Sequence, residues 1–173
     1  ELQLIMAKDC EVLVGISITP GLSESPFPEW ATVTRPYAQV PFVLAVTNPA
    51  YRSLGDIPAG KLLGAAVGGL GLNAVVTYNQ QRPADQRVRY LPYADPKLML
   101  RRLLDGTLSG LVIWQPQLAA VVKGNPAASD VKTGSLAPVK PVVTGIGNLV
   151  AARDAYLRAS IDRAIGQLVS DGT

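Results

Sequence analysis

Apolar residues in this chain gather in short runs that end at glycine, proline or polar residues. Runs of this length, too short for most helices, are typical of strands buried in the core of a protein. They lie within residues 9–20 and at residues 41–46, 62–67, 88–91, 111–114 and 139–151. We predict one strand from each run.

Two helices are predicted between these strands by their capping residues and apolar spacing. Residues 72–81 follow a glycine-rich turn and form the first. Asp95 and Pro96 are an N-cap and a first-turn residue for the second, and Gly106 ends it. The buried face of the second helix is expected to consist of Leu98, Met99, Leu103 and Leu104.

Two further helices follow, and the order of elements predicts the fold class. Pro116 opens a short helix that runs to about residue 123, and Asp154 caps a last one. The apolar stripe of the last helix consists of Leu157, Ile161, Ile165 and Leu168. Alternation of strands and helices predicts an α/β fold with a largely parallel sheet.

The start of the chain predicts an incomplete α/β unit. Leu2, Ile5 and Met6 have the spacing of one helix face, and a strand follows them directly. A helix end that leads into a strand is half of an α/β unit. We therefore expect the opening strand of this unit to be absent from the sequence.

Composition and charge indicate an ordinary globular protein. Hydrophobic residues make up 48% of the 173 residues and charged residues 17%, and the net charge is +3. No run of Lys and Arg suggests nucleic-acid binding, and no stretch reaches the ~18 apolar residues of a membrane span. The sequence shows no basic region followed by an apolar segment, so it is compatible with a mature secreted protein or a cytosolic one.

The residue inventory argues against catalysis and metal binding. The chain has no histidine and one cysteine, which excludes a Ser-His-Asp triad, a Cys-His nucleophile and the usual zinc sites. No cofactor is expected, because Gly69 and Gly71 lack the third glycine and the acidic residue of a dinucleotide motif. Cys10 is either a small buried apolar residue or half of a disulfide whose partner lies outside this sequence.

Five segments in family order resemble the type 2 periplasmic solute-binding proteins of ABC transporters. They are residues 17–20, 30–37, 41–46, 53–61 and 63–68. The resemblance implies a two-lobed α/β fold, a periplasmic location, and a small-molecule ligand in a cleft between the lobes. It assigns residues 1–47 and 141–173 to lobe one with the hinge strands, incomplete at its N-terminus, and residues 48–140 to lobe two.

The residues that bind amino acids in this family are replaced in this chain. Gly21 and Leu22 stand where an acidic residue and a carboxylate-binding arginine usually follow Ile-Thr-Pro. Gly68–Leu70 replaces Gly-Thr-Thr, and Trp114-Gln115-Pro116 replaces the segment with the ammonium-binding aspartate. Leucine cannot replace a bidentate guanidinium group, so we expect that no standard amino acid binds tightly.

Candidate ligand-binding residues follow from the same resemblance, and several have a simpler explanation. The candidates are Thr19, Arg35, Tyr37, Gly68, Gly69, Asn73, Trp114 and Gln115. Arg35 and Tyr37 line the cleft or only shape the turn before the hinge. The glycines bind an anion weakly or let strand and helix pack closely. Trp114 lines the cleft or fills the core.

Trp114 and Cys10 also resemble the J-type accessory proteins of quinoprotein methanol dehydrogenases (MxaJ and XoxJ type). Those proteins have Val-Trp-Gly-Pro where this chain has residues 113–116, and a cysteine at the position of Cys10 that has a second cysteine upstream. The resemblance implies a non-enzymatic protein with the dehydrogenase as its partner. The alternative is an ABC-transporter receptor for a small ligand that is not an amino acid.

Overall fold

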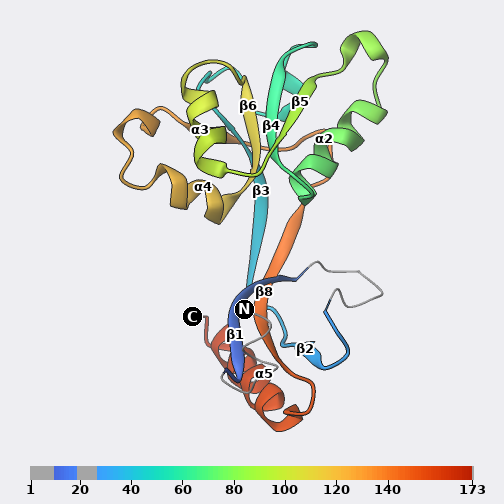
Figure 1. Cartoon of the computed structure of the whole chain (residues 1–173), viewed down its shortest axis with the longest axis vertical. Coiled ribbons are helices and arrows are strands. Elements are labelled where there is room, and N and C mark those ends of the chain that lie inside the picture. Colours follow the sequence, from blue (N-terminus) through green and yellow to red (C-terminus); the bar gives the residue numbers. More distant parts are fainter. Residues whose placement is uncertain (1–9, 19–26, 173) are drawn as a thin grey trace. The chain divides into compact units, whose positions relative to one another are not determined.

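The computed structural model describes residues 10–18 and 27–172 (Figure 1). The chain divides into two compact units. Unit 1 contains the described residues up to Val40 and those from Val143 onward, and unit 2 is Pro41–Val142. The assignment of these units to the two predicted lobes stays a prediction.

Unit 2 is built on a mixed sheet. Its strands follow the order β3 (Ala38–Val46), β6 (Gly110–Trp114), β4 (Leu62–Ala66) and β5 (Arg89–Tyr93), and β7 (Lys132–Gly134) pairs with β3. β4 is parallel to β5 and β6, whereas β3 is antiparallel to β6 and β7. The predicted largely parallel sheet is therefore confirmed for β5, β4 and β6 only.

Helices cover both faces of this sheet, which explains its uninterrupted apolar runs. Leu44 and Val46 of β3 belong to a buried cluster with residues of α2 (Leu70–Gln80). Ala45, between them, belongs to a second cluster with residues of α3 (Pro96–Leu104) and α4 (Gln115–Val122). Alternate residues of a strand point to opposite faces, so residues 42–46 of β3 and 111–114 of β6 are apolar at every position.

Short elements complete unit 2, and its capping residues agree with the sequence. Three 3-10 turns are present at Leu54–Asp56 (η1), Ala84–Gln86 (η2) and Pro126–Ala128 (η3). The Asp95 carboxylate accepts a hydrogen bond from Lys97 N at 2.8 Å, which confirms the predicted N-cap of α3. β5 is the outer strand of the sheet, a position that tolerates Pro92.

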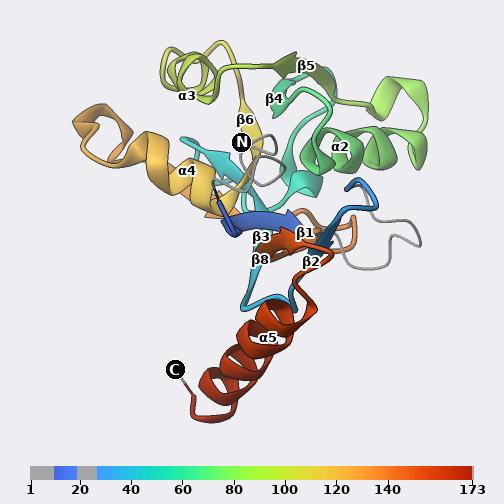
Figure 2. The ribbon, with the colours of Figure 1, turned by 60° about the horizontal axis from the view of Figure 1, so that its bottom comes forward.

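Unit 1 is organised around β8 (Val143–Ala151). β1 (Val12–Ile18) and β2 (Ala31–Val33) both pair with β8 in antiparallel orientation, and β1 lies alongside β8 in Figure 2. The register of β1 shifts between Val14 and Ile16, where Gly15 has a φ of +82°. β8 leads into α5 (Ala155–Ser170).

Three sequence predictions about elements need correction. The strand predicted at residues 139–151 begins at Val143, because Val139 N donates to Leu136 O in a turn and Val142 O accepts from Phe42 N. The sequence does not predict β2 and β7, because each has three residues and neither contains a run of apolar residues. Asp154 is the N-cap of α5, but its side chain makes no capping hydrogen bond.

Two kinds of feature are absent from the described residues. None of the helices there has the length and apolar character needed to cross a bilayer. Nor do three or more His, Cys, Asp or Glu side chains gather there in an arrangement that could hold a metal ion. The predicted helix face of Leu2, Ile5 and Met6 lies outside the described residues.

Candidate functional site

The carboxyl ends of the parallel strands in unit 2 bring most of the candidate residues to one edge. β4 ends at Ala66 and continues into the turn that contains Gly68 and Gly69, and β6 ends at Trp114. Ala65 is level with Val112 in the parallel register, so β4 and β6 end at the same edge of the sheet. Ligands of open α/β sheets bind at such edges.

Two backbone amides at the start of α2 are available to donate hydrogen bonds to a ligand at this edge. Gly68 has a φ of +66°, and Gly69 is an N-cap without a side-chain hydrogen bond. The amides of Leu72 and Asn73 donate to Gly69 O, at 3.0 and 3.3 Å. Within the described part of the chain, those of Leu70 and Gly71 have no acceptor. The first N–H groups of a helix attract acceptors and anions.

Close packing explains one glycine of the turn and helix, Gly71. A Cβ at this position would lie 3.0 Å from Val112 O and 3.1 Å from Phe42 Cδ1. The first turn of α2 therefore lies directly against β6 and β3. A Cβ on Gly68 would contact no atom within 4 Å, so its positive φ, and not space, favours glycine there.

Trp114 ends β6 and is the N-cap of α4. It is half-buried, its Cα pairs with that of Phe42 in the register of β3 and β6, and it belongs to neither buried cluster of unit 2. Gln115, the first residue of α4, and Asn73 of α2 are both exposed. The side chains of Asn73, Trp114 and Gln115 are aromatic or amide groups, and none of these three carries a charge.

Two residues at this edge are not among the candidates that the sequence predicts. Val67 follows β4 directly and is 61% exposed, and Phe42 lies next to both Gly71 and Trp114. Both belong to apolar runs that are typical of a core, and nothing in those runs distinguishes them from their buried neighbours. They extend the apolar surface beside the free amides of α2.

The remaining candidates belong to unit 1 or lie outside the described residues. Thr19 is in the latter group. The Arg35 amide donates to Asp162 Oδ1 of α5 at 2.7 Å, and the Tyr37 amide donates to Ile146 O of β8 at 2.8 Å. These contacts fix the connection between β2 and β3 within unit 1. A role of Arg35 or Tyr37 in ligand binding stays a prediction.

Cys10 of unit 1 forms no disulfide within the described residues. Its Sγ donates to Val12 O at 3.0 Å, and the side chain packs against the buried cluster of Ala31, Leu149 and Ala151. This environment is that of a small apolar residue. A disulfide with a cysteine outside this sequence stays a prediction.

One buried ionisable group belongs to α2, the helix that begins at the candidate edge. Tyr78 of α2 is 1% exposed, and its hydroxyl has no hydrogen-bond partner in the described part of the chain. Burial raises the pKa of this hydroxyl, against a smaller lowering by Arg82, whose guanidinium lies 4.3 Å from the centre of the ring. Tyr78 therefore stays neutral at physiological pH and acts as a core residue.

Comparisons with known proteins identify the fold. No protein-family model and no curated protein matches the chain. Solved structures do match it. The second substrate-binding domain of GlnP from Lactococcus lactis, in an open conformation, is 19% identical with a TM-score of 0.71, over 99% of this chain and 68% of that chain. The chain has the α/β fold of the two-lobed periplasmic binding proteins.

Two other structures agree with this fold. The ligand-binding core of GluR0 in complex with L-glutamate is 17% identical with a TM-score of 0.68, over 98% of this chain and 71% of that chain. An arginine transport-system periplasmic binding protein from Legionella pneumophila is 14% identical with a TM-score of 0.65, over 99% and 72%. At these identities the likeness concerns the periplasmic binding protein fold alone.

Proposed function

We propose that this chain belongs to a periplasmic binding protein that captures a small molecule for an ABC transporter. The carboxyl-end edge of unit 2 carries the proposal: it combines two free amides of α2 with an apolar, uncharged surface at Phe42, Val67 and Trp114. Pockets for small ligands are mostly apolar with a few polar groups that fix orientation. The fold supports this assignment, since it is similar to that of the GlnP substrate-binding domain and of the arginine transport-system periplasmic binding protein.

The chemistry of this edge favours an uncharged ligand with a hydrogen-bond acceptor. The amides of Leu70 and Gly71 supply two donors, whereas Leu70 and Trp114-Gln115 offer no carboxylate for an ammonium group. A zwitterion would leave its ammonium group desolvated and unpaired, which is costly. The proposed ligand therefore differs in chemistry from the L-glutamate in the GluR0 complex and from the arginine of the Legionella pneumophila transport system.

Tryptophan fluorescence offers a direct test, because the chain has two tryptophans, one in each unit. A panel of standard amino acids and uncharged acceptor compounds is titrated into Trp30→Phe, which reports Trp114, and into Trp114→Phe as the matched control. We expect uncharged compounds to change the Trp114 signal alone. Saturable binding of a standard amino acid would overturn the ligand class, and no response to any compound would overturn the site.

The methanol dehydrogenase hypothesis has less support. It depends on Cys10 and residues 113–116, and none of the structural neighbours named above is an accessory protein of a dehydrogenase. The transporter receptor is therefore the function we adopt. Salt-sensitive association with a quinoprotein methanol dehydrogenase in a pull-down, without binding of any small molecule, would reverse this choice.

A further inference from the structure

One face of α5 forms an open hollow of about 500 Å³ together with Arg35, and this hollow includes none of the residues used in the proposed function. All of its lining residues belong to unit 1. The polar side chains that line it are Arg35, Arg158, Asp162, Arg163, Gln167 and Ser170. Three guanidinium groups thus share the hollow with one carboxylate.

Gly166 leaves room for one of these guanidinium groups. A Cβ at this position would lie 3.0 Å from Arg35 Nη1, so the guanidinium group of Arg35 lies over the helix at the glycine. Glycine is a poor helix former, and this one is in the interior of α5. A side chain at this position would require Arg35 to shift by a few tenths of an ångström.

The positive charge of the hollow is not neutralised within the described residues. Asp162 Oδ1 accepts a hydrogen bond from the Arg35 amide at 2.7 Å, and neither of the two ion pairs found there involves Arg35, Arg158 or Arg163. Arg158 Nη1 donates to Thr32 Oγ1 of β2 at 3.4 Å, which leaves its other N–H groups available. Cationic donors therefore exceed acceptors in this hollow.

From this arrangement we infer that the hollow binds a small oxyanion of the phosphate class. A guanidinium group donates two parallel hydrogen bonds to a phosphate, and several such groups around one hollow favour a multivalent anion over a single carboxylate. Because the hollow is open to solvent, salt screens the interaction and the affinity is modest.

The test uses the whole 173-residue chain with inorganic pyrophosphate as probe, at low ionic strength, followed by nuclear magnetic resonance of the backbone amides. We expect saturable shifts centred on Gly166 and its neighbours in α5. Arg163→Gln, a residue for which no hydrogen bond or ion pair is found in the described chain, should weaken binding about two- to fivefold, as for an exposed charge pair.

Arg101→Gln is the matched control, because it removes the same charge from an exposed position on α3, outside the hollow. It should leave the dissociation constant unchanged. Equal weakening by both variants, or shifts spread over basic residues of both units, would show non-specific attraction and overturn the inference. A chain that shows no saturable shift would overturn it as well.

Discussion

The guanidinium group of Arg35 lies against α5 at Gly166, with Nη1 3.0 Å from the position of a Cβ there. Because Arg35 is exposed and its far end is flexible, a few tenths of an ångström of movement would accommodate alanine. We expect Gly166→Ala to stabilise the chain by up to ~1 kcal/mol through helix propensity, measured by urea unfolding. A loss of stability would mean that Arg35 cannot move, and Arg35→Ala in the same background should then restore the gain.

Gly134→Ala should be strongly destabilising. The added Cβ would overlap the backbone oxygen of Arg52 and lie 2.7 Å from its carbonyl carbon, and neither atom can move without shifting the chain. We expect a loss of about 3 kcal/mol or more in thermal or urea unfolding. Gly60→Ala is the control: its φ is +74° with no atom within 4 Å, so only the backbone conformation opposes it, at about 1–2 kcal/mol. Equal losses would contradict the steric explanation.

The two aspartates that begin helices should differ in their contribution to stability. Asp95 accepts a hydrogen bond from Lys97 N, whereas Asp154 makes no capping hydrogen bond. Asp95→Ala is expected to lower the free energy of unfolding by about 0.5–2 kcal/mol, and Asp154→Ala by clearly less. Urea unfolding of both variants at pH 7 is the measurement. A larger loss for Asp154→Ala would mean that its side chain caps α5 in solution.

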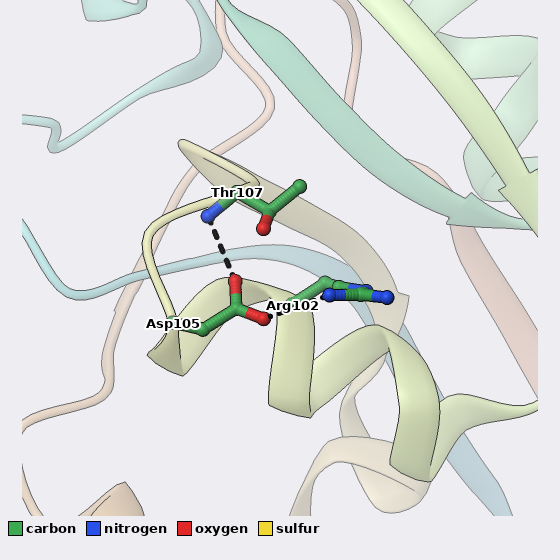
Figure 3. A network of polar contacts seen from close by, with 3 residues as sticks. All are labelled: Arg102, Asp105 and Thr107. Carbon is green, nitrogen blue, oxygen red and sulfur yellow. Dashed lines mark hydrogen bonds and ion pairs between the residues drawn. The ribbon is translucent and has the colours of Figure 1, made fainter.

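Asp105 should make stability depend on pH in the acid range. Figure 3 shows its carboxylate in contact with the Thr107 amide and the Arg102 guanidinium group. Hydrogen bonds from Thr107, and after them the Arg102 guanidinium, lower the pKa of Asp105 below its ordinary value of 3.8. A lowered pKa contributes stability that is present above the ordinary value and is lost as pH falls through the folded-state value. Asp105→Asn should therefore be less stable than the parent chain at pH 7, and this difference should shrink below pH 4.

The control for this experiment is Asp85→Asn, which removes the same charge from an exposed residue for which no hydrogen bond is found in the described chain. Its stability should follow that of the parent chain across the pH range. A difference for Asp105→Asn that stays constant from pH 7 to acid would mean that the hydrogen bonds do not depend on the charge.

Elements that are buried on both faces could be predicted from the sequence. Strands that exist only because a neighbouring strand pairs with them could not. β4, β6 and α3 carry their own signals, namely an apolar run or an N-cap and a glycine stop. β2 and β7 are strands only because β8 and β3 pair with them. The antiparallel direction of β3 was likewise invisible, because an apolar run reads the same in either direction.

The candidate site shows a similar limit. Glycine spacing located the turn before α2, but only the coordinates separate Gly71, which packing requires, from Gly68, which the backbone conformation requires. Arg35 is a candidate because of its place beside the hinge, whereas its contacts with Asp162 and Gly166 of α5 join residues more than a hundred positions apart. No local pattern encodes such a contact.

Unit 2 is a continuous segment, whereas unit 1 is assembled from the two ends of the chain. Phe42 N donates to Val142 O at 2.8 Å, so the two ends of unit 2 meet when it folds. During synthesis, β1 and β2 emerge first but have to wait for β8, which follows all of unit 2. Closing a loop costs less entropy when the intervening chain is already compact. Folding of unit 2 thus brings the two parts of unit 1 together. A substitution that slows the folding of unit 2 should therefore also slow the folding of unit 1.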